Sequence, residues 1–113
     1  MVKYVLNPDY EKMTDDELFS KVINDIKRTG EAHSVKHNKM LKLKEMKKDC
    51  VIFERESKND TNVQFDEIKE TIKILKSGQA INTSSLKVEV SQRRNQTPIL
   101  ALLWNADLLI KTD

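Results

Sequence analysis

The fold depends most on residues 29–53, which read TGEAHSVKHNKMLKLKEMKKDCVIF. The second residue of this stretch is a lone glycine, Gly30. Beyond the glycine, seven residues recur at spacings of three and four: Ala32, Val35, Lys39, Leu43, Met46, Cys50 and Phe53. Such spacing is close to the heptad seam of a coiled coil. We therefore expect a helix that begins near residue 31 or 34 and continues to residue 50 or later.

The segment before Gly30 predicts a first helix over residues 15–28. Residues 14–17, TDDE, have the form of a capping box, in which a Thr hydroxyl and a Glu carboxylate each accept an orphan backbone N–H. Leu18, Val22 and Ile26 then recur every four residues and form an apolar face. At Gly30 two outcomes are open: a left-handed residue that ends this helix, or a glycine tolerated inside a longer one at a cost of about 1 kcal/mol.

Geometry favours a bend at Gly30. An unbroken helix over residues 15–54 would be about 60 Å long. A compact chain of this length has a diameter of roughly 35 Å, so a single rod would protrude and need a partner for its seam. A helical hairpin instead buries its own seam, and we favour it over the protruding coiled coil.

Three later segments also carry local signals, and two of them allow two conformations. Residues 50–56 are either the last helical turns or a strand, because β-branched and aromatic residues cluster there, and residues 62–65 would then be the hairpin partner. Residues 65–77 predict a helix, with acidic residues first, basic residues last and a glycine after. Residues 86–90 alternate between apolar and charged side chains and favour a strand, with a short helix capped by Ser84 or Ser85 as the alternative.

Residues 98–110 are the most apolar part of the chain and favour a helix that begins at Pro98. Both faces of this segment are apolar in either conformation, so it must be covered from two sides. The simplest interpretation is a core element wrapped by the other helices. The alternative is that part of it, with Trp104, contacts a partner or a second copy of the chain.

Taken together, these patterns predict a mostly α fold, with α+β as the alternative if residues 50–65, residues 86–104 or both form a small antiparallel β element. The 113 residues are enough for one domain. We expect an N-terminal extension (1–13), a helical hairpin or long helix (14–56), and a helix followed by an apolar C-terminal element (63–113). Two glycines and two prolines suit long helices better than a β-sandwich with many turns.

Composition argues against several classes of protein. No apolar run approaches the roughly 18 residues of a membrane-spanning helix, and the first residues do not resemble a secretory signal, so we expect an intracellular protein, cytoplasmic or nuclear. One cysteine cannot form an intramolecular disulfide or a Cys-rich zinc site. His33 and His37 lie four residues apart but lack the His-Glu-x-x-His pattern, and are read as surface residues. No set of residues supplies a nucleophile, a base and an oxyanion site together, so we expect no enzyme, no cofactor, no metal and no small-molecule substrate.

The apolar seam and the C-terminal segment are the first candidate site. Burial of a few apolar side chains can supply most of the binding energy of a protein interface. We expect a non-enzymatic interaction or assembly module, an adaptor or regulatory subunit, that binds a protein partner or a second copy of itself. The candidate partner-binding residues are Val35, Leu43, Met46, Phe53, Leu100 and Trp104.

A basic segment suggests the alternative, a small nucleic-acid-binding regulator. Residues 27–50 carry eight Lys and Arg against three Asp and Glu, and such arrays bind phosphate backbones by releasing counterions. If residues 86–104 formed a strand–turn–strand, the order of elements would resemble a winged helix with arginines at the tip of the wing. The candidate residues are Lys36, Lys39, Lys42, Lys44, Lys47, Lys48, Arg93 and Arg94.

Overall fold

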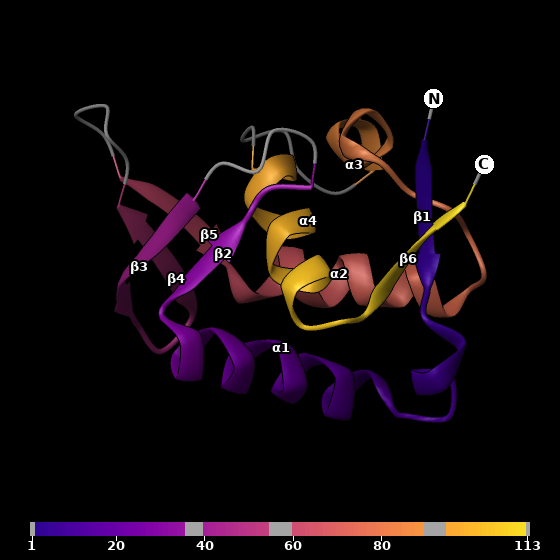
Figure 1. Ribbon diagram of the computed structural model, residues 1–113, viewed down its shortest axis with the longest axis horizontal. Coiled ribbons are helices and arrows are strands. Elements are labelled where there is room, and N and C mark those ends of the chain that lie inside the picture. The colour runs from indigo at the N-terminus through magenta and orange to yellow at the C-terminus, as the bar shows by residue number, and fades with distance from the viewer. Residues whose placement is uncertain (1, 36–39, 55–59, 90–94, 113) are drawn as a thin grey trace.

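A computed structural model describes residues 2–35, 40–54, 60–89 and 95–112 of the protein (Figure 1). It contains two antiparallel sheets, one of four strands in the order β2-β3-β4-β5 and one formed by β1 and β6. The elements follow in the order β1 (Lys3–Leu6), η1 (Pro8–Tyr10), α1 (Asp15–Thr29), β2 (Glu31–His33), β3 (Met40–Met46), β4 (Cys50–Glu54), β5 (Thr61–Gln64), α2 (Phe65–Lys76), α3 (Thr83–Glu89), α4 (Gln96–Asn105) and β6 (Leu109–Thr112).

The expected mostly α fold, with a helical hairpin or coiled coil over residues 14–56, is wrong, because the protein is α+β. The stretch beyond Gly30 forms three strands instead of a second helix. In β3, Leu41 and Leu43 are partly buried while Lys42 and Lys44 are exposed, which is the alternation of a strand with one covered face. The heptad spacing was therefore coincidental. The open alternative for residues 50–65 is the arrangement found, since β4 and β5 form an antiparallel hairpin.

The first helix is confirmed as α1, together with its capping box. The Thr14 hydroxyl accepts the N–H of Glu17 at 3.1 Å, and the Glu17 carboxylate accepts the N–H of Thr14 at 3.0 Å. Gly30 ends the helix with a φ of 71° and is therefore the left-handed residue of the first alternative. Its carbonyl then accepts the N–H of Leu43 at 2.8 Å, which joins the end of α1 to β3.

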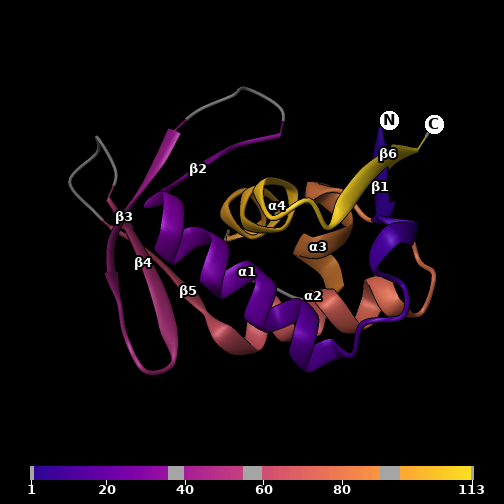
Figure 2. The same ribbon diagram turned by 60° about the horizontal axis from the view of Figure 1, so that its bottom comes forward.

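The helices lie on one side of the four-stranded sheet, with α4 at the centre of the molecule (Figure 2). Residues 98–103 of α4 are all buried, so this segment is the covered core element that its sequence predicts. The helix stops before residue 110, because Asp107 adopts a positive φ of 69° and the chain continues into β6. Among the helices the structure describes, none has the length and apolar character needed to cross a lipid bilayer.

The expected strand over residues 86–90 is also wrong, because residues 83–89 form helix α3. The Asn82 side chain accepts the N–H of Ser85 at 2.9 Å, and the Ser85 hydroxyl accepts the N–H of Asn82 at 3.0 Å. This reciprocal pair starts a helical turn at residues where apolar alternation alone favours a strand. Leu86 is fully buried at the inner side of that turn. The arginine-tipped wing would follow this segment at residues 90–94, which lie outside the described residues.

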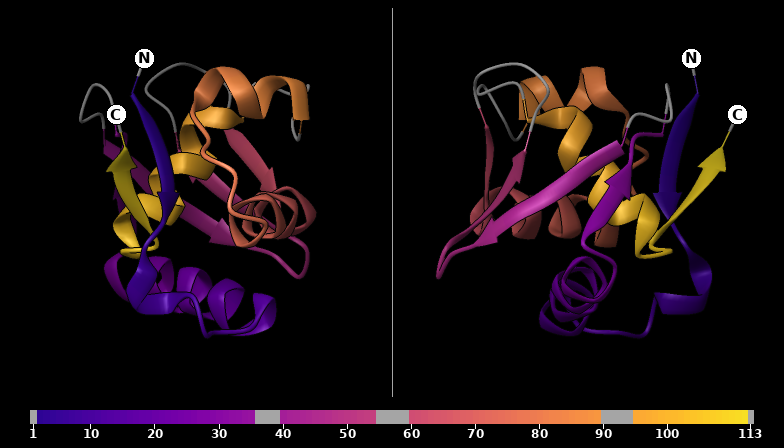
Figure 3. Two further views of the ribbon diagram at one scale, coloured as in Figure 1. Left: turned by 90° about the vertical axis from the view of Figure 1, so that its right-hand side faces the viewer. Right: turned by 60° about the vertical axis from the view of Figure 1, so that its left-hand side comes forward.

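The second sheet joins the two ends of the described chain. β1 pairs with β6 from Lys3↔Thr112 to Leu6↔Leu109, and the strands run side by side next to α3 (Figures 1 and 3). On its other side, Tyr4 forms an isolated bridge with Ile81. Residues 3–6, expected to lie in an N-terminal extension, are thus a paired strand with the Tyr4 side chain in the core.

Candidate functional site: a pocket beside the two-stranded sheet

A pocket of about 330 Å³ lies between the two-stranded sheet, the start of α3 and the middle of α4. These segments are far apart in sequence, and the β1–β6 pairing brings them together. The pocket is lined by Val2, Tyr4, Val35, Asn82, Thr83, Ser84, Leu100 and Lys111.

The base of the pocket is apolar and its rim is polar. Leu100 is fully buried and Tyr4 is 7% exposed, whereas Val2 and Lys111 are exposed. The Tyr4 ring meets the Trp104 ring edge to face, with the centroids 5.5 Å apart, so the packing of α4 holds this wall in place. A concave apolar surface with a few polar groups at its rim is the usual form of a binding site.

Three of the six predicted partner-binding residues meet at or behind this pocket. Val35 and Leu100 line it, and Trp104 supports it through Tyr4. The other three form no exposed seam: Leu43 and Met46 are partly buried against the core, and Phe53 is completely buried.

Sequence reasoning missed six lining residues: Val2, Tyr4, Asn82, Thr83, Ser84 and Lys111. These residues show no common pattern along the chain because they meet only through tertiary contacts. The one usable signal is the clustering of β-branched and aromatic residues within residues 2–6, VKYVL, which is typical of a short strand.

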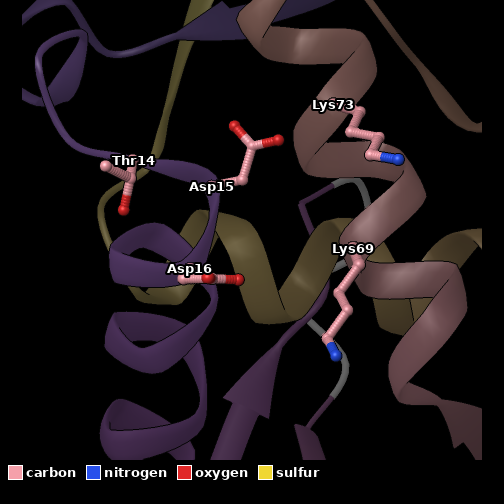
Figure 4. A pocket seen from close by; sticks show the side chains of 5 residues that line it. All are labelled: Thr14, Asp15, Asp16, Lys69 and Lys73. Carbon is pink, nitrogen blue, oxygen red and sulfur yellow. The ribbon is translucent and has the colours of Figure 1, made fainter.

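A second pocket, of about 350 Å³, lies between the start of α1 and the exposed face of α2 (Figure 4). Asp15 and Asp16 line one wall, and Lys69 and Lys73 line the other. The fifth lining residue, Thr14, already uses its hydroxyl in the capping box. Since the two walls carry opposite charges, this pocket shows no preference for an anion or a cation, and we regard it as a solvated cleft.

The described residues of the basic segment lie beside acidic ones. The Lys44 ammonium donates to the Asp60 carboxylate at 2.6 Å, and this hydrogen bond raises the pKa of Lys44. Lys42 lies between Glu31 and Glu54 in the register of the sheet. Lys47 and Lys48 are exposed at the turn between β3 and β4. Lys36, Lys39, Arg93 and Arg94 lie outside the described residues, so the structure brings no larger basic patch into view.

The described histidine and the cysteine lie apart, His33 on β2 and Cys50 on β4. In the ranges that the structure describes, no group of three or more His, Cys, Asp or Glu residues could hold a metal ion. Cys50 is 2% exposed, and burial raises the pKa of its thiol, which favours the protonated form. The His33 Nε2 atom lies 3.6 Å from a Glu31 carboxylate oxygen at the surface of the sheet. His37 lies outside the described residues.

Comparisons with protein-family models, with curated proteins and with solved structures find no match to this chain. A function for the protein must therefore be inferred from the chemistry of the pocket and of the surrounding surface.

Proposed function

We propose that this protein is a non-enzymatic interaction module that binds a segment of a protein partner at the pocket beside the two-stranded sheet. The observation that carries the proposal is the composition of this pocket. A fully buried Leu100 and a nearly buried Tyr4 form its base, while Val2 and Lys111 stand exposed at its rim. An apolar side chain of a partner would lose its own water over this base and would cover the exposed side chain of Val2, and the polar rim would orient it.

One of the exposed apolar side chains supports the same surface. In the described part of the chain, three large hydrophobic residues are more than one third exposed: Val2 at 50%, Met40 at 49% and Ile110 at 38%. Of these three, Val2 lines the pocket, whereas Ile110 lies on the opposite face of the two-stranded sheet and Met40 lies on β3. An exposed apolar side chain at the rim of an apolar pocket adds surface that a partner can bury.

Selection from a random peptide library displayed on phage tests the proposal. Peptides enriched on the immobilised protein are synthesised, and their affinities are measured for two variants. Val2→Glu places a charge at the pocket rim, and we expect it to weaken binding about tenfold or more, since a carboxylate must lose water when an apolar group docks beside it. Met40→Glu is the matched control, because Met40 is equally exposed but lies on β3, away from the pocket.

Two outcomes contradict the proposal. One is that no peptide is enriched above an unrelated protein of similar charge. The other is that Val2→Glu and Met40→Glu bind the selected peptides equally well, which would place binding elsewhere on the surface.

A further inference from the structure

We propose that the bound partner segment is an extended, acidic stretch of polypeptide that adds as a third strand to the free edge of β6. This inference rests on the proposed function and names the class of partner and its mode of binding. It is drawn from the direction of the backbone hydrogen bonds, from the free edge that they leave, and from the charge of the two strands.

The hydrogen bonds of Tyr4 show which backbone groups of β6 are free. The Tyr4 N–H donates to the Ile81 carbonyl at 2.7 Å, and the Tyr4 carbonyl accepts the Ile81 N–H at 2.8 Å, so both groups point away from β6. Successive residues of a strand direct these groups to opposite sides. The groups of Lys3 and Val5 therefore point toward β6, where their register partners are Thr112 and Ile110.

The same alternation assigns the remaining residues of β6. Since Ile110 and Thr112 bond to β1, the N–H and C=O groups of Leu109 and Lys111 point to the opposite edge. A further hydrogen bond agrees with this assignment. The Leu108 carbonyl accepts the N–H of Asn7 at 2.7 Å, and Leu108 lies two residues before Ile110, so its backbone groups point to the same side.

The free edge of β6 is open in the part of the chain that the structure describes. No hydrogen bond there reaches the outward backbone groups of Leu109 or Lys111. Figure 3 shows β6 as the outer strand of its pair, with no described segment along its free side. An exposed strand edge is a template for an added strand, because its unpaired groups already have the spacing of a β-ladder.

The charge of the sheet indicates the chemistry of the added strand. Lys3 and Lys111 are the only charged side chains within β1 and β6, all of whose residues are described. Lys111 lies opposite Tyr4 and therefore shares its face of the sheet, at the rim of the pocket. An acidic residue opposite Lys111 would lie on that face and pair with the ammonium group.

The next residue of the partner would meet an apolar position. It would lie opposite Ile110, which is 38% exposed and shares the other face of the sheet with its register partner Val5. The residue after that would lie opposite Leu109, which is 3% exposed and shares the face of Lys111 and the pocket, so an apolar side chain fits there. A strand with one acidic residue opposite Lys111 and apolar residues after it thus complements both faces of the edge.

A synthetic peptide with one Glu at its centre and Val and Thr on either side, blocked at both ends and carrying a fluorophore, is the probe (the Glu-Val probe), and fluorescence anisotropy is the measurement. We expect it to bind the protein, and we expect the same peptide with Lys in place of Glu to bind more weakly. Lys111→Gln removes the charge but keeps the outward N–H, so it should weaken binding by at most about fivefold, since exposed ion pairs are weak.

Lys111→Pro separates strand addition from charge. Proline removes the outward N–H as well as the charge, and it is tolerated on an edge strand where that N–H faces solvent. We expect it to bind the Glu-Val probe about tenfold more weakly than Lys111→Gln does, while it unfolds at a similar temperature. Thr112→Pro is the contrasting variant, because it removes an N–H that bonds to β1 and should lower the unfolding temperature.

Modified probes keep the test independent of how these variants fold. N-methylation of every second residue blocks one edge of the peptide strand. One methylated isomer should lose binding and the isomer with the opposite phase should keep it, because only one edge of the peptide pairs with β6.

Three results overturn this inference. Strand addition is excluded if Lys111→Gln and Lys111→Pro bind the probe equally well, or if the protein binds both methylated isomers equally well. Either result excludes strand addition even when Val2→Glu weakens binding of the selected peptides, as the proposed function requires. Failure of the Glu-Val probe, when the protein does bind selected peptides of other composition, excludes the acidic partner. A dimer in light scattering that becomes a monomer on Lys111→Pro assigns the edge to a second copy instead.

Discussion

Asn105 at the end of α4 donates a hydrogen bond from Nδ2 to the backbone carbonyl of His33, 72 residues away, at 2.8 Å. At the other end of the same helix, Asn95 donates from Nδ2 to the backbone carbonyl of Asn62 at 2.8 Å. His33 lies on β2 and Asn62 on β5, the two edge strands of the four-stranded sheet. A ten-residue helix is about 15 Å long, close to the roughly 14 Å across four strands, so α4 covers the sheet from edge to edge.

Removal of the Asn105 amide should destabilise the protein. Nδ2 of Asn105 also donates to the Ala101 carbonyl at 2.7 Å, so Asn105→Ala leaves two carbonyls without this donor. We expect the free energy of unfolding to fall by about 1–2 kcal/mol in urea denaturation, and further for Asn105→Asp, whose carboxylate would face both carbonyls. Asn24→Ala on the exposed side of α1 is the control and should cause little change. An unchanged midpoint for Asn105→Ala would mean that water replaces the amide at no cost.

A side chain at Gly30 should destabilise the protein through backbone conformation alone. The φ of Gly30 is 71°, and a Cβ atom there would meet no other atom within 4 Å. We therefore expect Gly30→Ala to lower the free energy of unfolding by about 1 kcal/mol, and Gly30→Asn by less, because Asn tolerates the left-handed region. Chemical denaturation of the two variants measures this order, and equal stability of all three proteins would contradict it.

The Cys50 thiol should react slowly in the folded protein. Its side chain is buried, and the loss of solvation raises its pKa. At about pH 8, a thiol reagent should therefore modify the unfolded chain much faster than the native one. Rapid modification of the native protein under the same conditions would place Cys50 at an accessible surface.

The raised pKa of Cys50 also predicts a dependence of stability on pH. Above the unfolded value of about 8.5, the unfolded chain loses the thiol proton while the folded chain keeps it, so stability falls as the pH rises. The decline continues until the pH passes the pKa of the folded state. Unfolding of the wild type and of Cys50→Ala should be compared at about pH 7 and about pH 10, on either side of that unfolded value, and Cys50→Ala should lose less stability between them.

Substitutions at two positions on β3 test whether this segment is a strand packed on the core or part of an exposed helical interface. Leu43 is partly buried against the core and lies opposite the buried Phe53, whereas Met40 is 49% exposed. We expect Leu43→Glu to lower the free energy of unfolding by about 2 kcal/mol or more, because it places a charge against apolar groups, and Met40→Glu to have little effect. Measurements of denaturation and of solution mass together test this. A stable Leu43→Glu variant with altered oligomeric state would instead support an interface at Leu43.

Two of the helices, α1 and α2, could be predicted well from local patterns. The capping box at Thr14, the apolar face from Leu18 to Ile26, and the acid-to-base order of residues 65–77 correspond to α1 and α2. Each signal lies within a few residues of the structure that it predicts, because helical hydrogen bonds and caps join neighbours along the chain.

The strands of residues 31–46 could not be predicted in this way. Their apolar residues recur every three or four positions, as in a helix, and in β3 they also recur at every second position, as in a strand. The backbone of a strand finds its hydrogen-bond partners on another strand, and the choice between the two periods depends on whether such a partner is present. For β3 the partners are β2 and β4, one on each side.

The amino-acid sequence alone determined where α1 and α2 begin and end, and that residues 98–103 must be covered from two sides. Tertiary structure alone decided that β1 and β6 pair, that Val35 and Leu100 share a pocket with Lys111, and that one edge of β6 has no partner among the described residues. The physical reason is the range of the interactions: caps and helical faces act between near neighbours, whereas a sheet and its pocket arise from backbone groups that meet only after the chain has folded.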